Sequence, residues 1–322
     1  MKETLLDIKN LQVDFKNEDS CVHALRGVDF SIHESESVGL VGESGCGKSL
    51  TALSIMQLIQ SPPGKISGGE IWFDNENLLK KTEKEMRKIR GSKISMIFQE
   101  PMTSLNPVFT IGNQLEEVIK LHMHVSKKES VDMVEEMLNK VGISDVHSRI
   151  EEYPHELSGG LRQRVMIAMA LLCKPKMLIA DEPTTALDVT IQAQILQLIN
   201  SLKNELGTSV LMITHDLGVI AESCSVVNVM YAGCIVERGE VHELFKNPEH
   251  PYTKGLFSSI PVLGKHERLS TIPGMVPDLG DMPSGCAFYP RCSFCNEKCK
   301  KIKPELIGNN EHEVACWRVN NE

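Results

Sequence analysis

The chain of 322 residues lacks three features that would assign it to nucleic acid, a membrane or an export route. It has no excess of basic residues, since its net charge is −9, whereas a general nucleic-acid binder is usually basic. It has no run of the roughly 18 apolar residues that a membrane helix needs, because its longest apolar run, VMIAMALLC, covers only residues 165–173. Its first residues, MKETLLDIKN, lack the apolar core of a signal peptide. We therefore expect a protein that stays in the cytoplasm.

Disulfides are not expected either, although the chain contains ten cysteines. The cytoplasm keeps thiols reduced, and clustered cysteines in that compartment favour metal binding over cross-linking. Such a cluster is present, because half of the cysteines lie after residue 285: Cys286, Cys292, Cys295, Cys299 and Cys316.

The strongest local pattern is a phosphate-binding loop. Residues 37–41 predict a short buried strand, residues 42–49 match G-x-x-x-x-G-K-[ST] at every fixed position, and residues 50–59 predict a helix. Glycines let backbone N–H groups wrap around phosphate oxygens, and the helix N-terminus adds partial positive charge. We expect Lys48 to reach the β- and γ-phosphates and the Ser49 hydroxyl to ligate Mg²⁺.

A second apolar run, residues 177–180, predicts a buried parallel strand that ends in two carboxylates. Ligands bind at the C-terminal ends of strands in open α/β sheets, and Asp181 and Glu182 follow this strand directly. Asp181 suits Mg²⁺ coordination through water, and Glu182 suits polarising the attacking water. Two adjacent carboxylates would repel each other without a nearby cation. Taken alone such a pair is often a solvated strand end, but together with the phosphate loop it indicates a metal-nucleotide site.

Two further strands end in polar side chains. Residues 209–216 contain His215, one helix (residues 189–206) after the carboxylate strand, and His215 could contact the γ-phosphate. A lone histidine at a strand end is otherwise structural. Residues 93–100 form another apolar strand pattern, which ends near Gln99.

The segment HELSGGLRQRVMIAMALL resolves the family, because residues 157–160 resemble the signature sequence of ABC-type ATPases. The phosphate loop, Gln99, the carboxylate pair, residues 186–188 and His215 follow the order of motifs in that superfamily. Three segments are further similar to the ATP-binding subunits of dipeptide/oligopeptide importers: VGESGCGKSLTALSIM, FQEPMTSLNPVFTIGNQLEE and YPHELSGGLRQRVMIAMAL. They resemble the first of that system's two ATPase types more than the second, and nickel importers belong to the same subfamily.

The resemblance implies roles that spacing alone does not give. Two such domains sandwich two nucleotides head to tail, so Ser158 and Gly160 would bind the γ-phosphate held by the partner's loop. Gln99 would sense Mg²⁺ and water and pass closure to the membrane subunits, and Asp188 would link the two sites. Phe15 occupies the position where an aromatic ring stacks on adenine, with a core phenylalanine as the alternative.

One residue departs from the family pattern. Leu161 replaces the glutamine that commonly follows the signature glycines, so no γ-phosphate contact is expected from it. The expected catalytic residues are Glu182, His215, Gln99 and Lys48. The expected Mg²⁺ ligands are Ser49, Gln99 and Asp181. The expected nucleotide contacts are Phe15, Gly42, Ser44, Gly45, Cys46, Gly47, Lys48, Ser49, Leu50, Gln99, Ser158, Gly160 and Asp188. At Cys46 a small residue at a variable position is favoured over a redox switch.

We thus expect an α/β fold, an ABC-type nucleotide-binding domain over residues 1–258 with a helical subdomain near 101–173. The segments IGNQLEEVIKLHM and SVDMVEEMLNKVG in that subdomain show apolar spacing of three and four. Residues 100–107 would form its entry loop and a docking site for a membrane subunit, with a proline-bounded turn as the alternative. HPYTKGLFSSIP would close the domain, and residues 259–322 would form a small irregular Cys-rich extension.

That extension is rich in Pro and Gly and has too few apolar residues for a core, so it needs a staple. A metal centre supplies one, because ligand binding is coupled to folding. Four thiolates suit zinc and an iron–sulfur cluster equally, and the spacings between the cysteines fit no standard ligand pattern. Free thiols without a metal are the third alternative. The resemblance implies a [4Fe–4S] cluster on Cys286, Cys292, Cys299 and Cys316, with Cys295 extra or an alternative ligand.

The expected function is an ATP-hydrolysing motor of a di- and oligopeptide importer, bound peripherally at the cytoplasmic face of the membrane. Its expected partners are two permease subunits, a second ATPase that is a different chain, and an extracytoplasmic binding protein through the complex, with no nucleic acid. The alternatives are a nickel importer ATPase of the same subfamily and a soluble ABC ATPase. The soluble ABC ATPase lacks support, because the sequence shows no long coiled coil and no second ATPase domain.

Overall fold

The computed structural model describes residues 3–16, 20–99, 104–185, 187–259, 272–277, 280–309 and 311–319. These residues form two compact units. The unit that we call the carboxylate unit contains Glu3, His33–Glu36 and Lys80–Met212. The unit that we call the phosphate-loop unit contains the described parts of Thr4–Ile32, Ser37–Leu79 and Ile213–Glu322. Residues 100–103, in the expected entry loop, and residues 260–271, which include the last two residues of the expected closing helix, lie outside the described part.

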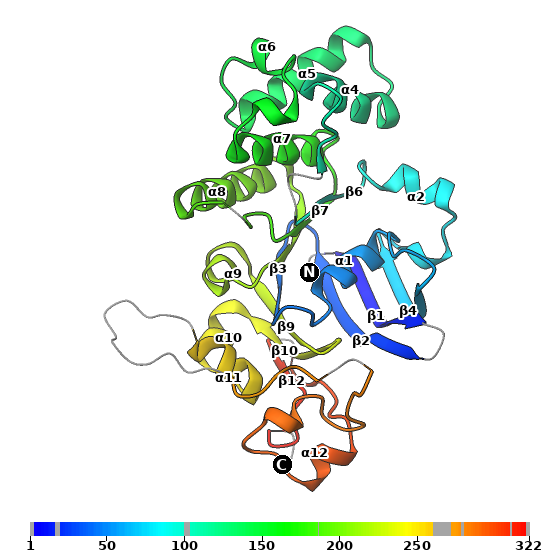
Figure 1. Cartoon of the computed structure of the whole chain (residues 1–322), viewed down its shortest axis with the longest axis vertical. Helices are drawn as coiled ribbons and strands as arrows, with labels where there is room; N and C mark the ends of the chain where they lie inside the picture. Colours follow the sequence, from blue (N-terminus) through cyan, green and yellow to red (C-terminus); the bar gives the residue numbers. More distant parts are fainter. Residues whose placement is uncertain are drawn as a thin grey trace. The chain divides into compact units, whose positions relative to one another are not determined.

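The phosphate-loop unit holds two groups of strands. The first is a four-stranded sheet with the order β2-β1-β4-β5, in which β1 runs antiparallel to β4 (Figure 1). Its members are β1 (Thr4–Lys16), β2 (Cys21–His33), β4 (Gly64–Phe73) and β5 (Glu76–Asn77). The second has the order β11-β12-β10-β9-β3. Its members are β3 (Ser37–Val41), β9 (Val226–Tyr231), β10 (Cys234–Glu240), β11 (Ile307–Asn309) and β12 (His312–Val314).

The strand β3 confirms the sequence prediction in both bounds and in burial. All five of its residues are buried, and it pairs in parallel with β9. A strand covered on both faces reads as a continuous apolar run, which is why SVGLV was recognisable. The helices and turns of this unit are α1 (Lys48–Ile55), η1 (Leu78–Lys80), α9 (Leu217–Ser223), α10 (Val241–Lys246), α11 (Pro251–Ser258), η3 (Tyr289–Arg291) and α12 (Glu297–Lys301).

The helix α1 differs from its prediction at both ends. It begins at Lys48, inside the phosphate pattern, because Gly47 is its N-cap. It ends before Met56, and Gln57 then adopts a left-handed backbone with φ +48°. A left-handed residue is a common end to a helix, so residues 56–59 lie outside the observed helix, although the sequence predicted them within it.

The carboxylate unit holds the strands in the order β8-β7-β6, with β6 parallel to β7. These are β6 (Ile94–Ile97), β7 (Met177–Asp181) and β8 (Ser209–Ile213). Its helices are α2 (Glu83–Ile89), α4 (Ile111–His122), α5 (Lys127–Lys140), α6 (Val146–Arg149), η2 (Pro154–Glu156), α7 (Gly159–Leu171) and α8 (Val189–Leu206). The last of these matches its predicted bounds.

The segment predicted as a helical subdomain contains α4, α5, α6 and α7. In α4 the buried residues Ile111, Leu115 and Ile119 recur at every fourth position and make one apolar face. Ser126 and Glu129 form a capping box at the start of α5, which satisfies N–H groups that the helix itself cannot pair. The helix α7 packs against α4, α5 and α8, so the group of helices shares one core (Figure 1).

The Cys-rich extension is more regular than expected. The strand β12 pairs antiparallel with β10, with Glu237 opposite Val314, and β11 pairs with β12. The fully buried Glu237 carboxylate lies 2.7 Å from His312 Nε2 and accepts hydrogen bonds from the N–H groups of Glu249 and His250. The extension therefore continues the sheet of its unit. Across the described residues, no helix is long and apolar enough to cross a membrane.

Candidate nucleotide site

The phosphate loop has the backbone that only glycine permits at two positions. Gly42 has φ +154°, and a Cβ there would lie 2.2 Å from the carbonyl oxygen of Met230. Gly47 has φ +111°, and a Cβ there would lie 2.7 Å from a methyl group of Leu25. Such contacts are too short for any side chain, so the two glycines fix how closely the loop approaches its own sheet.

The predicted phosphate ligands lie together in this loop. Lys48 is 6% exposed, and its Nζ donates to the carbonyl oxygens of Gly42 at 2.8 Å and Glu43 at 3.2 Å. Ser44 and Gly45 are exposed, and Ser49 and Leu50 are half-buried. The ammonium group is thus folded into the concave side of the loop. Its contact with the phosphates stays a prediction.

Cys46 has the surroundings of a structural residue. It is 1% exposed, and burial raises the pKa of its thiol. A thiol that is shielded and protonated is a poor nucleophile, so the structure favours the small-residue interpretation over the redox switch.

The carboxylate unit brings Gln99 and Glu182 together. Asp181 is 3% exposed at the end of β7, and Glu182 follows it with φ +47°. A left-handed backbone at a residue with a side chain costs on the order of 1–3 kcal/mol and is concentrated at functional sites. Glu182 Oε2 accepts hydrogen bonds from Gln99 Nε2 at 3.1 Å and Thr185 Oγ1 at 2.9 Å. The candidate base is therefore held in one orientation by two donors.

Sequence reasoning missed two residues of this arrangement. One is Thr185, for which the only signal was a hydroxyl three residues after the glutamate. The other is Gln163 of α7, which is fully buried and donates through Nε2 to the Pro183 carbonyl oxygen at 2.5 Å. Gln163 ties the helix that follows the signature to the segment that carries Glu182.

The signature residues form an exposed helix start. Ser158 is the N-cap of α7, and its hydroxyl accepts a hydrogen bond from the Leu161 N–H at 3.4 Å. Ser158 and Gly159 are exposed, so the unpaired N–H groups of the first helical turn are available to an anion. A Cβ at Gly160 would lie 3.2 Å from Ile191 of α8, which explains the small residue.

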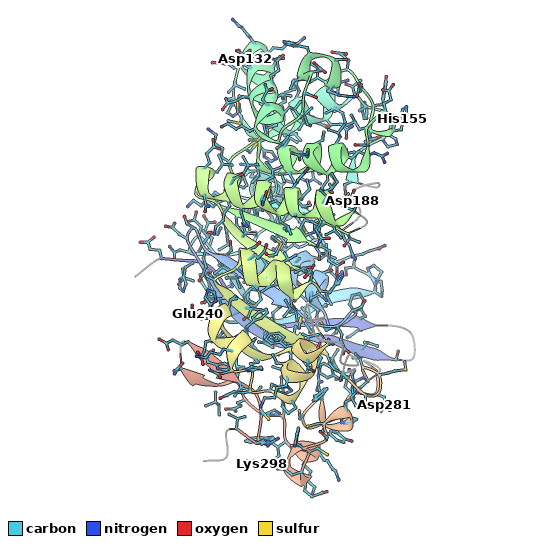
Figure 2. The ribbon with its side chains drawn as sticks, turned by 90° about the vertical axis from the view of Figure 1, so that its left-hand side faces the viewer. Asp132, His155, Asp188, Glu240, Asp281 and Lys298 are labelled. Atoms are coloured by element: carbon cyan, nitrogen blue, oxygen red, sulfur yellow. The ribbon has the colours of Figure 1, made fainter. Side chains whose placement is uncertain are left out.

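Asp188 caps the next helix. It lies at the start of α8 (Figure 2), and its Oδ1 accepts a hydrogen bond from the Ile191 N–H at 3.0 Å. Asp188 is exposed, and the adjacent Val189 is 83% exposed. Both side chains therefore remain accessible on the surface of the carboxylate unit.

The two remaining predicted contacts belong to the phosphate-loop unit. Phe15 is half-buried on β1 opposite Gly64 of β4, and its ring edge lies 3.0 Å from where a Cβ of Gly64 would be. The glycine therefore leaves room for the aromatic ring. His215 is exposed just after β8, and Asp216 beside it caps α9 through the N–H groups of Gly218 and Val219.

The four expected cysteine ligands of the extension line one pocket, together with Phe288, Trp317 and His250; they are Cys286, Cys292, Cys299 and Cys316. Burial, with a smaller contribution from the neighbouring cysteines, raises the pKa of the Cys286 thiol to about 11. Cys295 is exposed and does not line the pocket. The structure thus separates Cys295 from the other four.

Known protein families match both parts of the chain. A model of the ABC transporter family matches residues 25–185, and a model of the oligopeptide/dipeptide transporter C-terminal region matches residues 236–299. The dimeric ATP-binding cassette MJ0796, solved in a post-hydrolysis state bound to ADP and Pi, is 30% identical. That likeness has a TM-score of 0.66 and covers 73% of this chain and 98% of that one.

Curated relatives are similar over nearly the whole length. The oligopeptide transport ATP-binding protein AppD of Bacillus subtilis is 51% identical over 99% of this chain and 98% of its own. The dipeptide transport ATP-binding protein DppD of the same organism is 49% identical over 98% and 95%. A probable peptide ABC transporter ATP-binding protein of Sinorhizobium fredii is 52% identical over 99% and 96%. The chain therefore belongs to the ATP-hydrolysing subunits of ABC transporters, in the oligopeptide/dipeptide family.

Proposed function

We propose that the chain is the motor subunit of an importer that moves di- and oligopeptides across the cytoplasmic membrane. The motor role is supported by the Glu182 carboxylate, which Gln99 and Thr185 hold at the end of a buried strand. The peptide cargo is supported by the oligopeptide and dipeptide transport proteins to which the chain is similar.

The hydrolysis step is inferred from the roles that the sequence predicts for these side chains. Lys48 and the N–H groups of the loop bind the β- and γ-phosphates. Glu182 takes a proton from the attacking water, whose oxygen bonds to the γ-phosphorus as the bond to the β,γ-bridging oxygen breaks. The products are ADP and inorganic phosphate, and His215 contacts the γ-phosphate. Ser49, Gln99 and Asp181 would hold Mg²⁺, which neutralises phosphate charge when bound.

Transport requires a second ATPase domain. The exposed helix start at Ser158 and Gly160 binds the γ-phosphate that the partner's loop holds, by the same helix-end electrostatics. Asp188 links the two sites, Phe15 stacks on adenine, and Gln99 reports closure to the membrane subunits. The partner ATPase is a different chain, and closure of the pair switches two permease subunits that receive cargo from an extracytoplasmic binding protein.

This assembly places the chain on the cytoplasmic face of the membrane, and fractionation tests it. The chain is expected to sediment with membranes when both permease subunits are expressed and to remain in the supernatant when either is deleted. Persistence in the supernatant with both permeases present would instead support the soluble ABC ATPase alternative.

The cysteine pocket supports a polynuclear metal centre. In the described part of the chain, three potential metal ligands lie within 4.8 Å of one another only at Asp14, Cys21 and His23, so no three of the pocket thiols are that close. A single zinc with sulfur at about 2.3 Å holds its thiolates about 3.8 Å apart. Four thiols that line one pocket, no three of them mutually within 4.8 Å, fit a [4Fe–4S] cluster better than a single zinc, because each would ligate a different iron.

Cys286, Cys292, Cys299 and Cys316 would hold that cluster, which would staple the extension to its sheet. Iron, acid-labile sulfide and zinc are measured in protein purified without oxygen. About four iron and four sulfide per chain are expected, lost together in the Cys286→Ser/Cys292→Ser variant and retained in Cys295→Ser. Zinc, or no metal, would contradict the cluster and leave the ATPase assignment intact.

A further inference from the structure

A buried arginine of the Cys-rich extension forms an ion pair with a residue of the phosphate loop. The Arg291 side chain is 4% exposed, and its Nη1 and Nη2 donate to the two carboxylate oxygens of Glu43 at 2.7 and 3.0 Å. Glu43 follows Gly42 as the second residue of the phosphate loop. Paired, parallel hydrogen bonds between a guanidinium and a carboxylate fix geometry as well as charge.

The other contacts of Arg291 leave it one orientation. Its Nε donates to the Pro273 carbonyl oxygen at 2.9 Å, and Nη2 also reaches the Ile272 carbonyl oxygen at 3.4 Å. The guanidinium carbon lies 5.8 Å from the ring centres of both Tyr231 and Phe288. Since carbonyls, carboxylate and aromatic faces surround it, the arginine is built into its site rather than placed on a surface.

Glu43 is also held through its backbone. Its N–H donates to the hydroxyl of Tyr252 at 2.8 Å, and Tyr252 is fully buried. The rings of Tyr231, Tyr252 and Phe288 pack on one another with centres 4.7 to 5.5 Å apart. The carbonyl oxygen of Glu43 in turn accepts from Lys48 Nζ at 3.2 Å. One residue of the phosphate loop is thus tied to Arg291, to Tyr252 and to the phosphate-binding lysine.

The ion pair removes an electrostatic conflict. The loop presents N–H groups and Lys48 to phosphates, and a carboxylate inside the same loop would repel those phosphates. Arg291 neutralises this carboxylate and turns it toward the extension. Without the arginine, the Glu43 charge would be partly buried and unpaired next to the anion site, which is costly.

The arginine is positioned by the cysteine segment. It ends η3, the turn Tyr289–Arg291, and Cys292 follows it directly. Phe288, on the other side of that turn, packs against Tyr231 and Tyr252. Cys286 and Cys292 therefore bracket the short segment that carries both the aromatic contact and the guanidinium.

We propose that Arg291 is a positioning residue for nucleotide binding, through which the Cys-rich extension neutralises Glu43 and holds the phosphate loop in its binding shape. The inference rests on the proposed nucleotide chemistry and does not depend on which metal the cysteines hold. It makes the extension a part of the ATP site of its own chain.

The test is a mutant cycle on affinity for a non-hydrolysable ATP analogue, measured by calorimetry with the full chain and Mg²⁺. Arg291→Ala is expected to weaken binding about 30-fold or more, because it leaves a carboxylate unpaired beside the phosphates. Glu43→Gln is expected to stay within about threefold of wild type, because the amide oxygen still accepts from Arg291. The double variant is expected to regain at least about tenfold of the loss, because the repelling charge is gone.

The controls separate this role from general damage to the extension. Arg318, whose guanidinium lies 4.1 Å from the Phe294 ring centre, is a second arginine of the extension, and Arg318→Ala is expected to bind as wild type. Arg291→Lys keeps the charge without the paired geometry and is expected to fall between wild type and Arg291→Ala. Arg291→Lys also tests the proposal if Arg291→Ala fails to fold.

Because coupling between nucleotide binding and the Arg291 segment acts in both directions, amide hydrogen exchange of that segment gives a second test that does not measure affinity. Bound nucleotide is expected to slow amide hydrogen exchange of residues 286–292 in the wild type and not in Arg291→Lys. Unchanged affinity in the folded Arg291 variants, or a loss that Glu43→Gln fails to relieve, would overturn the proposal. Absence of nucleotide binding in the wild type would contradict the proposed function instead.

Discussion

Replacing Glu182 by Gln removes the proposed base while leaving its surroundings in place. The amide has the shape of the carboxylate, so its oxygen still accepts from Gln99 Nε2 and Thr185 Oγ1, which lie at 3.1 and 2.9 Å in the structure. The left-handed backbone at φ +47° is equally available to both residues. Folding and nucleotide binding are therefore expected to survive, and only proton removal from the attacking water is lost.

The magnitude follows from what a positioned base contributes. General-base catalysis is worth about 10²–10⁴-fold in rate, or roughly 3–5 kcal/mol of transition-state stabilisation. We expect phosphate release at saturating MgATP to fall by that factor in Glu182→Gln, while the affinity for ATP stays within about threefold of wild type. The rate is measured in the assembled transporter, because the isolated chain lacks its partner domain.

Glu117→Gln is the matched control, since Glu117 is an exposed glutamate on α4 and its replacement is expected to leave the rate unchanged. A hydrolysis rate in Glu182→Gln within twofold of wild type would refute the base assignment. Loss of ATP binding together with hydrolysis would show that Glu182 acts in binding and not in proton transfer.

Two further predictions concern the phosphate loop and acid stability. Gly42→Ala is expected to abolish detectable ATP binding, because its Cβ would lie 2.2 Å from the Met230 carbonyl oxygen. Gly68→Ala of β4, whose Cβ would meet only the flexible Gln12 side chain at 3.3 Å, is the control that is expected to bind, and equal titrations of both would contradict this account. Burial lowers the pKa of His250 to about 3 from an ordinary value of 6.5, so the folded histidine stays neutral while the unfolded one takes up a proton below pH 6.5. Stability conferred by this group is therefore complete above pH 6.5 and declines as the pH falls toward 3, by about 2 kcal/mol at pH 5. His250→Asn keeps an acceptor for the Tyr252 N–H. Urea unfolding measures how far the free energy of unfolding falls from pH 7 to pH 5, and this fall should be about 2 kcal/mol smaller in His250→Asn than in wild type. An equal fall in both proteins would contradict the lowered pKa of His250.

The sequence predicted the strands and helices whose signals are local. The buried run of β3, the apolar spacing of α4 and the bounds of α8 were each predictable from one short window of residues. The phosphate loop and the signature were equally visible, because backbone geometry there demands particular small residues at fixed spacing.

Contacts between distant segments were not predictable in the same way. The hydrogen bond from Gln99 to Glu182 and the ion pair of Arg291 with Glu43 join residues far apart in the chain, and no periodicity encodes them. The strands β11 and β12 have three residues each, too few to show alternation. They exist because β10 offers an edge to pair with, which is a property of the folded sheet.

The peptide-import account is tested most directly by uptake in a strain from which this gene alone is deleted. Uptake of a labelled dipeptide, a labelled oligopeptide and labelled nickel is compared in the deleted strain, with wild-type complementation and with Glu182→Gln. We predict that peptide uptake is lost on deletion, returns with the wild-type chain and stays absent with Glu182→Gln, while nickel uptake is unchanged throughout. Peptide uptake that survives the deletion, or nickel uptake that is lost in place of it, would contradict the account.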